Sequence, residues 1–335
     1  MSVVLGIETS CDETGVAVVQ AGREVLSNEV ASQIDLHRVF GGVVPEIASR
    51  QHTKVISQLV EKALEDAGAE VDAVAVTVGP GLMGSLLVGV CFAKALAYAW
   101  GKPLVPVHHI EGHIFSAFLG EHAPEFPFLA LIVSGGHTQL IDCRAPHQYA
   151  ILGTTRDDAV GESFDKVARL LGLPYPGGPS IQQAAAGGNP EAFSFPRAMR
   201  DKDTLEFSYS GLKTAVLYAL RAEGAAPAPA DVAASFQAAA VDILLIKTRQ
   251  ALALTGARRL VVAGGVAANR LLRERLTKEV DAEVFMPPLA YCIDNGAMIA
   301  AAGDSRLRHG VMRWWAISRR RPMRVSRCTP HRGTR

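Results

Sequence analysis

The sequence contains few cysteines and no CxxC pair. The chain has 335 residues and five cysteines, which are Cys11, Cys91, Cys143, Cys292 and Cys328. An odd number of scattered cysteines excludes a disulfide framework and a cysteine-based zinc site. This usage is typical of a chain that stays in a reducing compartment.

A secretion signal is also lacking. The N-terminus, MSVVLGIETS, has neither a basic region nor a long apolar run. The longest apolar stretch, residues 82–100, is about long enough to cross a bilayer. It carries Lys94 near its centre, and Gly84, Ser85 and Gly89 near its start. We therefore expect a buried helix rather than a membrane span, and a cytoplasmic protein.

The chain lacks the overall positive charge of many nucleic-acid-binding proteins. Its net charge is +1, but residues 311–335 hold eight arginines and no acidic residue. Residues 1–310 therefore contain 26 basic against 33 acidic residues, a net charge of −7. By bulk charge this body is not an obvious nucleic-acid binder; if it binds RNA, a local patch, the tail or a partner must hold the RNA.

The bulk composition is that of a globular α/β protein. Hydrophobic residues make up 49%, charged residues 20% and aromatic residues only 6% of the chain. Such a chain can bury a sizeable core, and its length suits two domains of moderate size.

Two segments have the pattern of a strand, a short polar turn and a returning strand. They cover residues 3–19 and 128–143, about 125 residues apart. Each is followed by further helices and strands, which indicates an internal duplication at the level of the fold. The alternative at this stage is that two unrelated hairpins look alike.

Other segments have helical spacing. We expect helices over residues 48–68 and 157–171, and a long helix that Asp231 caps and that runs to about residue 255. Residues 172–179 and 223–230 are rich in Gly, Pro or Ala and predict loops.

A pair of histidines has the spacing of metal ligands. In a helix, His109 and His113 would lie one turn apart on the same face. Glu111 would lie about 200° around the helix from both, which argues against a zinc protease, where the base sits beside the metal-bound water. Asp294 precedes an apolar helix, and it is either a third ligand or merely a helix cap.

Small polar residues occupy the two hairpin tips. Residues 134–138 have the sequence SGGHT. Their backbone N–H groups could approach an anion closely, or the segment could form only a tight turn. The first tip offers Asp12 and Glu13 at the equivalent place. A later strand runs into a Gly264-Gly265 turn and a helix, an arrangement that suits an anion or an adenosine but also close packing. Together these features predict a cleft for a phosphorylated adenosine compound, without a P-loop.

Ten sequence motifs follow one another between about residue 3 and residue 309. They are GIETSCDETGVAV, GGVVPEIASRQH, GPGLMGSL, HHIEGH, VSGGHT, GESFDKVAR, YPGGP, FSYSGLKTA, GGVAANRLLR and CIDNGAMIAAAG. In these motifs, and in their order and spacing, the chain resembles the TsaD family of tRNA adenosine threonylcarbamoyltransferases.

This resemblance implies the fold of actin, Hsp70 and sugar kinases, with two duplicated α/β domains and the active site in the cleft between them. The first domain would cover residues 1–108, completed by a helix near 295–310. The second would cover residues 109–294. Residues 311–335 depart from the family pattern, and form either an RNA-binding tail or a frameshift artefact.

The resemblance also assigns residues to roles. One divalent metal, Fe2+ or Zn2+, would be bound by His109, His113 and Asp294. The substrate-binding residues would be Ile132, Val133, Ser134, Gly135, Gly136, Asp165, Gly178 and Asn269. Asp12 and Glu13 are our candidates for the catalytic carboxylates.

The implied reaction transfers a threonylcarbamoyl group from L-threonylcarbamoyl-adenylate to N6 of adenosine 37 in tRNA. Bacterial members work with a TsaB-like paralogue and a TsaE-like ATPase, and a TsaC-type synthase makes their donor. Two rivals stay open: an ATPase or kinase of the same fold, and a non-catalytic scaffold, which we would expect to lack the three metal ligands.

Overall fold

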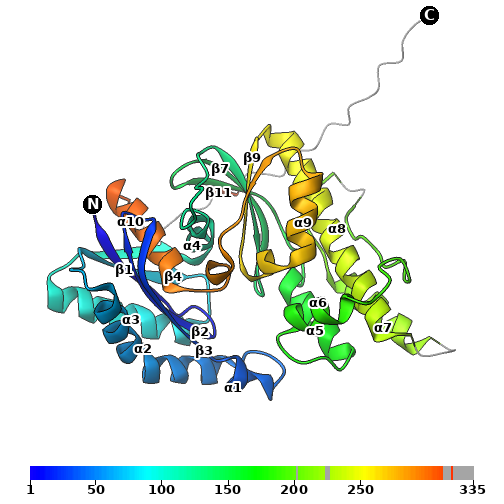
Figure 1. Ribbon diagram of the computed structural model, residues 1–335, viewed down its shortest axis with the longest axis horizontal. Coiled ribbons are helices and arrows are strands. Elements are labelled where there is room, and N and C mark those ends of the chain that lie inside the picture. The colour runs from blue at the N-terminus through cyan, green and yellow to red at the C-terminus, as the bar shows by residue number, and fades with distance from the viewer. Residues whose placement is uncertain (201–202, 223–226, 312–317, 320–335) are drawn as a thin grey trace, which may run out of the picture.

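The computed structural model describes residues 1–200, 203–222, 227–311 and 318–319. Within them the chain forms two lobes that lie side by side, each built on a sheet with helices against it (Figure 1).

The first lobe is built on a five-stranded sheet with the order β3-β2-β1-β4-β5. In its centre β1 is antiparallel to β2 and parallel to β4. The strands are β1 (Val3–Glu8), β2 (Glu13–Gln20), β3 (Glu24–Ser32), β4 (Ala73–Gly79) and β5 (Leu104–His108).

The second sheet repeats this plan. Its order is β10-β9-β6-β7-β8-β11, with β6 antiparallel to β7 and parallel to β9. The strands are β6 (Phe128–Val133), β7 (Thr138–Ala145), β8 (Gln148–Thr154), β9 (Arg259–Ala263), β10 (Glu283–Phe285) and β11 (Ser318–Arg319). Apart from β11, the order and the directions match those of the first sheet, so the predicted duplication of the fold is confirmed.

Helices cover both faces of the first sheet (Figure 1). They are α2 (Pro45–Ala67), α3 (Met83–Trp100) and, from the far end of the sequence, α10 (Gly296–Arg308). The short helix α1 (Ile34–Arg38) follows β3. Side chains alternate along β1, so that Leu5 and Ile7 pack toward α2 and α3, whereas Val4 packs toward α10. A Cβ at Gly6 would lie 2.2 Å from the carbonyl oxygen of Gly296, so this glycine lets α10 approach the strand.

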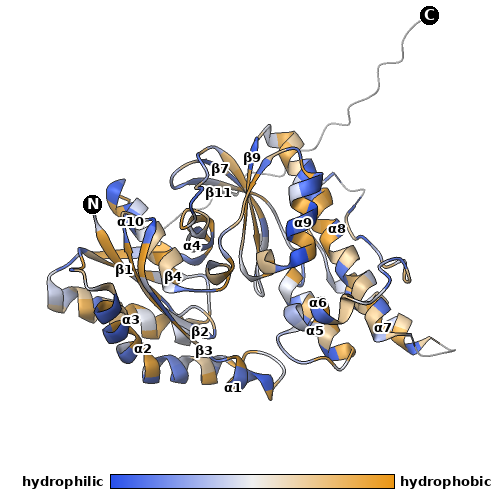
Figure 2. Cartoon of the chain, in the orientation of Figure 1, coloured by the Kyte–Doolittle hydropathy of each residue, from blue (hydrophilic) through white to orange (hydrophobic). Residues whose placement is uncertain are grey.

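The second lobe carries α5 (Val160–Leu170), α6 (Gly177–Ala185), α7 (Ser210–Arg221), α8 (Pro229–Thr255), η1 (Gly265–Ala268), α9 (Arg270–Glu279) and η2 (Leu289–Tyr291). In Figure 2, β1 and the strands around β9 have mainly hydrophobic colours, whereas α9 is mainly hydrophilic. This pattern is expected of sheets that lie inside each lobe and of a helix that faces solvent on its outer side.

One short helix, α4 (His109–Ser116), lies between the two lobes (Figure 1). It begins directly after β5, where the side chain of His108 caps it by accepting a hydrogen bond from the Ile110 N–H. Ile110 and Ile114 pack beneath the second sheet. A Cβ at Gly112 would lie 2.7 Å from Cδ1 of Ile299, so α4 and α10 are in close contact.

The prediction that residues 82–100 form a buried helix is half right. They form α3, but only 28% of it is buried, and Met83, Leu87 and Tyr98 are exposed. The reason is that α3 lies on the outside of the first lobe. Among the described residues α3 and α8 are long and apolar enough to cross a membrane by length and composition alone, and α8 is 67% buried.

Four predicted boundaries were wrong, and one of them is the start of α2, which begins at Pro45 rather than at residue 48. Helix α5 begins at Val160 rather than at Asp157, because the Asp157 carboxylate accepts the Tyr209 N–H at 2.8 Å, beside the start of α7. Helix α6 begins at Gly177, inside the predicted loop 172–179. Its first turn contains Pro179, and proline is tolerated in the first turn of a helix. Helix α8 begins at Pro229, so Asp231 lies in its first turn instead of capping it.

Two predictions fall partly outside the described residues. They concern the loop at residues 223–230, of which 223–226 are not described, and the tail at 311–335. The domain bounds 1–108 and 109–294 stay a prediction, although α10 does pack on the first sheet.

Candidate metal centre and the adjoining cavity

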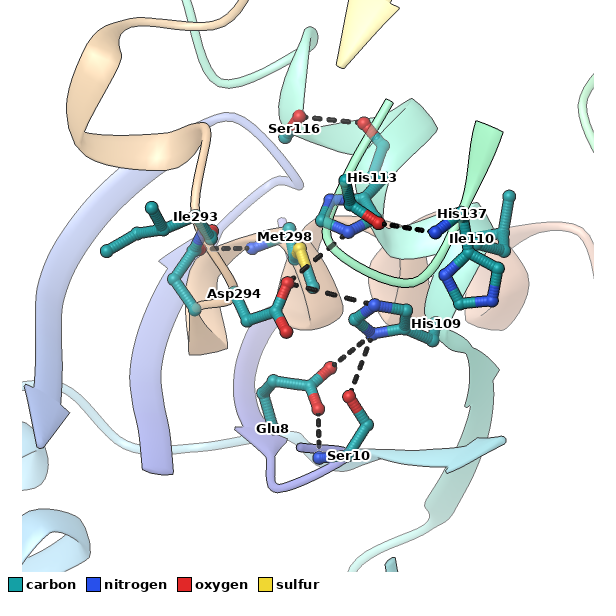
Figure 3. A network of polar contacts seen from close by, with 12 residues as sticks. Glu8, Ser10, His109, Ile110, His113, Ser116, His137, Ile293, Asp294 and Met298 are labelled. Atoms are coloured by element: carbon teal, nitrogen blue, oxygen red, sulfur yellow. Dashed lines mark hydrogen bonds and ion pairs between the residues drawn. The ribbon is translucent and has the colours of Figure 1, made fainter. Parts of the chain in front are cut away.

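The two histidines of α4 and Asp294 come together at one point between the lobes (Figure 3). Nε2 of His113 lies 3.3 Å from Oδ1 of Asp294, and Nε2 of His109 lies 3.7 Å from the same oxygen. All three ligand atoms lie within 4.8 Å of one another. The one-turn spacing predicted from the sequence therefore places both imidazoles on one face of α4.

Asp294 does not cap the helix that follows it. Asn295 does so, since its Oδ1 accepts the Met298 N–H at 2.9 Å. The cap alternative for Asp294 is therefore wrong, and its carboxylate is directed at the histidines.

The residues present fit a divalent metal. His113 is fully buried. Within the described part of the chain its Nδ1 has no hydrogen-bond partner, and its Nε2 has only the contact with Asp294 at 3.3 Å. Buried polar atoms are nearly always satisfied, so this incomplete set of partners needs an explanation. A cation between two imidazoles and one carboxylate supplies it, and this ligand set suits zinc or iron.

Charges around this group are strongly coupled. Burial opposes ionisation of Asp294, but His109 and His113 outweigh burial and hold the pKa of this carboxyl well below its usual range. Burial likewise disfavours the charged form of His109, but Asp294 and Glu8 raise its pKa to about 9. In His137, whose ring centroid lies 5.9 Å from that of His109, burial and the two neighbouring histidines lower the pKa to about 3.

The opposite face of α4 holds Glu111, as predicted. Its Oε1 lies 2.7 Å from Nδ1 of His147 and accepts the Tyr149 hydroxyl at 3.3 Å, while its Oε2 accepts from Nη1 of Arg306 at 2.7 Å. Glu111 is fully buried and Arg306 is 1% exposed. A carboxylate held in this way cannot act on water at the metal centre, which agrees with the rejection of a zinc protease.

A cavity of about 810 Å³ opens beside the metal centre. Most of the residues that the sequence assigned to the site line it: Asp12, Glu13, His109, Ser134, Gly135, Gly136, Asp165, Gly178, Asn269 and Asp294. Three others do not line it. Ile132 and Val133 are fully buried within β6, and His113 lies behind the cavity wall.

The tip between β6 and β7 forms one wall of the cavity. The Ser134 N–H donates to the carbonyl of His137 at 2.8 Å, so the turn itself uses this donor. A Cβ at Gly135 or at Gly136 would meet nothing within 4 Å. These two glycines, rather than Ser134, are therefore the part of the predicted loop that an anion can approach closely.

Two further predicted contacts also line the cavity. Oδ1 of Asp165 accepts the Gly177 N–H at 2.7 Å, and burial raises the pKa of this carboxyl to about 6. Asn269 is already engaged, because Oδ1 caps α9 by accepting the Leu272 N–H and Nδ2 donates to Gln237. The roles of Asp165 and Asn269 toward an adenosine stay predictions.

The cavity is lined by more acidic than basic side chains. The acids are Asp12, Glu13, Glu162, Asp165 and Asp294, and the bases other than histidine are Lys166 and Arg169. Burial, together with Asp12 and Asp294, raises the pKa of Glu13 to about 9. Even with Glu13 protonated, the acids outnumber Lys166 and Arg169, so a cation would be attracted to this cavity and would favour the binding of a phosphate there.

Sequence reasoning missed two residues that shape the site. Glu8 ends β1 and lies 3.1 Å from Nδ1 of His109. His52 fixes the first hairpin tip, because its ring nitrogens lie 2.7 Å from the Thr14 hydroxyl and 2.9 Å from the Cys11 carbonyl oxygen. A carboxylate at the end of an apolar strand was the available signal for Glu8.

A family model described as TsaD, tRNA N6-adenosine threonylcarbamoyltransferase, matches residues 24–301. The chain belongs to the TsaD family. The description of that family names a transferase that acts on tRNA, and the described residues of this chain include a histidine–aspartate group that could bind a metal ion.

Solved structures show the same fold. A full-length HypF structure matches with a TM-score of 0.61 at 13% identity, over 92% of this chain and 46% of its own. HypF of T. kodakarensis matches with a TM-score of 0.62 at 14% identity, over 92% of this chain and 48% of its own. Component A of the (R)-2-hydroxyglutaryl-CoA dehydratase of Acidaminococcus fermentans matches with a TM-score of 0.56 at 12% identity, over 92% of this chain and 100% of its own. The TsaD chain thus spans about half the length of HypF, and the predicted fold class is confirmed.

Proposed function

We propose that this TsaD protein transfers the threonylcarbamoyl group from L-threonylcarbamoyl-adenylate to N6 of adenosine 37, releasing AMP. The acceptors are tRNAs that read codons beginning with adenine. The observation that carries the proposal is that a three-ligand metal group and a glycine turn for an anion border the same cavity. Its volume of about 810 Å³ is within the usual range for a ligand of this size.

The donor would lie across this cavity. Asp165 would accept hydrogen bonds from the ribose, and the adenine would lie near Gly264, Gly265 and Asn269. The phosphate of the donor would face Gly135 and Gly136, beside the metal centre. The backbone N–H groups of these two glycines would stabilise the negative charge that grows on the departing AMP.

One divalent metal, Fe2+ or Zn2+, would be held by His109, His113 and Asp294. When bound, it supplies Lewis acidity and offsets the negative lining of the cavity. The ligand set fits either ion.

The transfer itself forms one bond and breaks another. N6 of the adenine attacks the carbamoyl carbon, and the bond from that carbon to the phosphate oxygen breaks, with its electron pair leaving on AMP. N6 must also lose a proton. Glu13 is a poor acceptor, because its raised pKa leaves it protonated at neutral pH, so Asp12 is the remaining candidate of the two.

Orientation must supply much of the rate. An exocyclic amine is a weak nucleophile, and holding it against the carbamoyl carbon replaces a bimolecular step by an effectively unimolecular one. The target adenosine lies in a single-stranded loop, so it can be splayed out into the cavity at small cost.

Family membership supports a proposal for the partners and the location. We propose that the protein works in the cytoplasm with a TsaB-like paralogue and a TsaE-like ATPase, on donor made by a TsaC-type synthase. A kinase of the same fold would instead turn over ATP without tRNA. The complete ligand group favours the enzyme over a scaffold.

A transfer assay separates these alternatives. The protein with its proposed partners receives unmodified tRNA and threonylcarbamoyl-adenylate, and digested nucleosides are read by mass spectrometry. We expect threonylcarbamoyladenosine, lost on chelation and recovered on adding metal back. ATP hydrolysis without tRNA and without product would favour the kinase, and a folded but inert protein would favour the scaffold.

A further inference from the structure

Glu8 is a fully buried carboxylate in the first lobe, at the end of β1. No lysine or arginine pairs with it among the described residues. Oε2 accepts the Thr77 hydroxyl at 2.6 Å, and Oε1 accepts the Ser10 N–H. Burying a charged carboxylate is costly unless other groups compensate it, so its remaining contact is informative.

That remaining contact is His109. Oε2 of Glu8 lies 3.1 Å from Nδ1 of the ring, and the Ser10 hydroxyl lies 3.2 Å from the same nitrogen (Figure 3). The other ring nitrogen, Nε2, lies on the side of Asp294. A histidine that binds a metal through Nε2 carries its proton on Nδ1, and Nδ1–H is then the donor that Glu8 faces.

The second histidine of the pair has no such support. Nδ1 of His113 lacks a hydrogen-bond partner within the described chain. The two histidines on this face of α4 are therefore held differently. Glu8 of the first lobe contacts the ring of His109, whereas His113 is held by the side chains that pack around its ring.

We propose that Glu8 is a positioning residue, which keeps the proton of His109 on Nδ1 and directs Nε2 at the metal. The proposal rests on the proposed metal site but not on the transfer reaction. Because Glu8 and Thr77 belong to adjacent strands of the first sheet, they also tie the metal centre to that lobe.

A purely structural role is the alternative. In that case Glu8 would only hold the turn after β1 through the Ser10 N–H, and a neutral acceptor would serve equally well. Glu8→Gln separates the two roles, because glutamine keeps the shape and an oxygen acceptor but removes the negative charge.

The test measures zinc binding by the metal-free protein, in competition with a chromophoric chelator. We expect Glu8→Gln to bind Zn2+ about 10- to 100-fold more weakly than the wild type, as is usual when the partner of a ligating histidine is lost. Unchanged affinity in a folded variant would overturn the proposal. Asp304→Asn is the matched control: it also removes a fully buried carboxylate, but one that contacts Ser2 and Arg308, and we expect wild-type affinity.

A second measurement needs no variant. Nitrogen-15 spectra of the imidazoles in the zinc-loaded wild type should show His109 protonated on Nδ1 and bound through Nε2. Metal binding through Nδ1 would overturn the proposal, whether or not Glu8→Gln folds.

The failure of this proposal can be told from the failure of the metal site. If His113→Ala leaves zinc affinity unchanged, the three-ligand site is wrong. If His113→Ala abolishes zinc binding but Glu8→Gln does not weaken it, the site stands and only the role of Glu8 falls.

Discussion

The two faces of α4 differ in how well their polar atoms are satisfied. On one face, the two buried histidines share a single carboxylate, that of Asp294, and Nδ1 of His113 has no hydrogen-bond partner in the described chain. On the other face, Glu111 is equally buried, but both of its oxygens have partners, which are His147, Tyr149 and Arg306. The incompletely satisfied face is the one that has room for a ligand, whereas the satisfied face joins α4 to α10 and to the second sheet.

The contrast shows how one eight-residue helix can contribute both to the packing of the fold and to the candidate metal centre. Its satisfied face fixes α4 against α10, and the segment just before α10 carries the proposed third ligand, Asp294. We therefore expect stability and metal binding to be separable by face, and each variant below changes one face at a time.

The largest effect is expected on the satisfied face. Glu111→Ala removes the buried carboxylate that pairs with the Arg306 guanidinium, so we expect a loss of about 3–5 kcal/mol in the free energy of unfolding, measured in urea. The double variant Glu111→Met/Arg306→Met removes both charges and should lose much less. A single variant as stable as the wild type would contradict the role given to this face.

The metal face should show the opposite pattern. His113→Ala removes a ligand, so we expect transfer to fall at least about 100-fold, since losing even the partner of a ligand costs 10- to 100-fold. Its unfolding free energy should change far less than that of Glu111→Ala. His122→Ala, which alters an exposed histidine, is the control. Full activity in His113→Ala would disprove metal-dependent transfer.

The contact between α4 and α10 can be tested by a single methyl group. Gly112→Ala places a Cβ 2.7 Å from Cδ1 of Ile299, and we expect this overpacking to cost about 1–3 kcal/mol in the free energy of unfolding. At Gly211 an added Cβ meets nothing within 4 Å, so Gly211→Ala should be neutral or slightly stabilising. Equal stability of the two variants would show that the helices do not depend on this contact.

The smallest effect is expected away from α4, at Asp165. Because burial raises the pKa of this carboxyl to about 6, it is ionised above that pH and protonated below it. A protonated carboxyl accepts ribose hydrogen bonds poorly, so KM for the adenylate should rise as pH falls, roughly fourfold at pH 5.5. The same dependence in Asp165→Asn would assign the titration to another group.

The sequence predicted the parts of the site that depend on local spacing. The one-turn separation of His109 and His113, and the position of Glu111 on the other face, follow from helix geometry alone. The hairpin tips could be recognised because apolar strands flank a short polar turn.

Long-range contacts could not be predicted in this way. Arg306 lies 195 positions from Glu111 in the chain, and no local pattern indicates that pairing. The choice between ligand and cap for Asp294 needed the structure, because Asn295 beside it is an equally good cap. The exposure of α3 was missed because an apolar composition does not tell an outer helix from a central one.

The most direct test of the account is to strip the protein of metal and add it back in measured amounts. Single-turnover transfer should be absent from the stripped protein and should rise linearly until about one equivalent of Fe2+ or Zn2+ per chain is bound. Transfer at the full rate by protein that contains no metal would contradict the central claim that His109, His113 and Asp294 form a metal centre for this reaction.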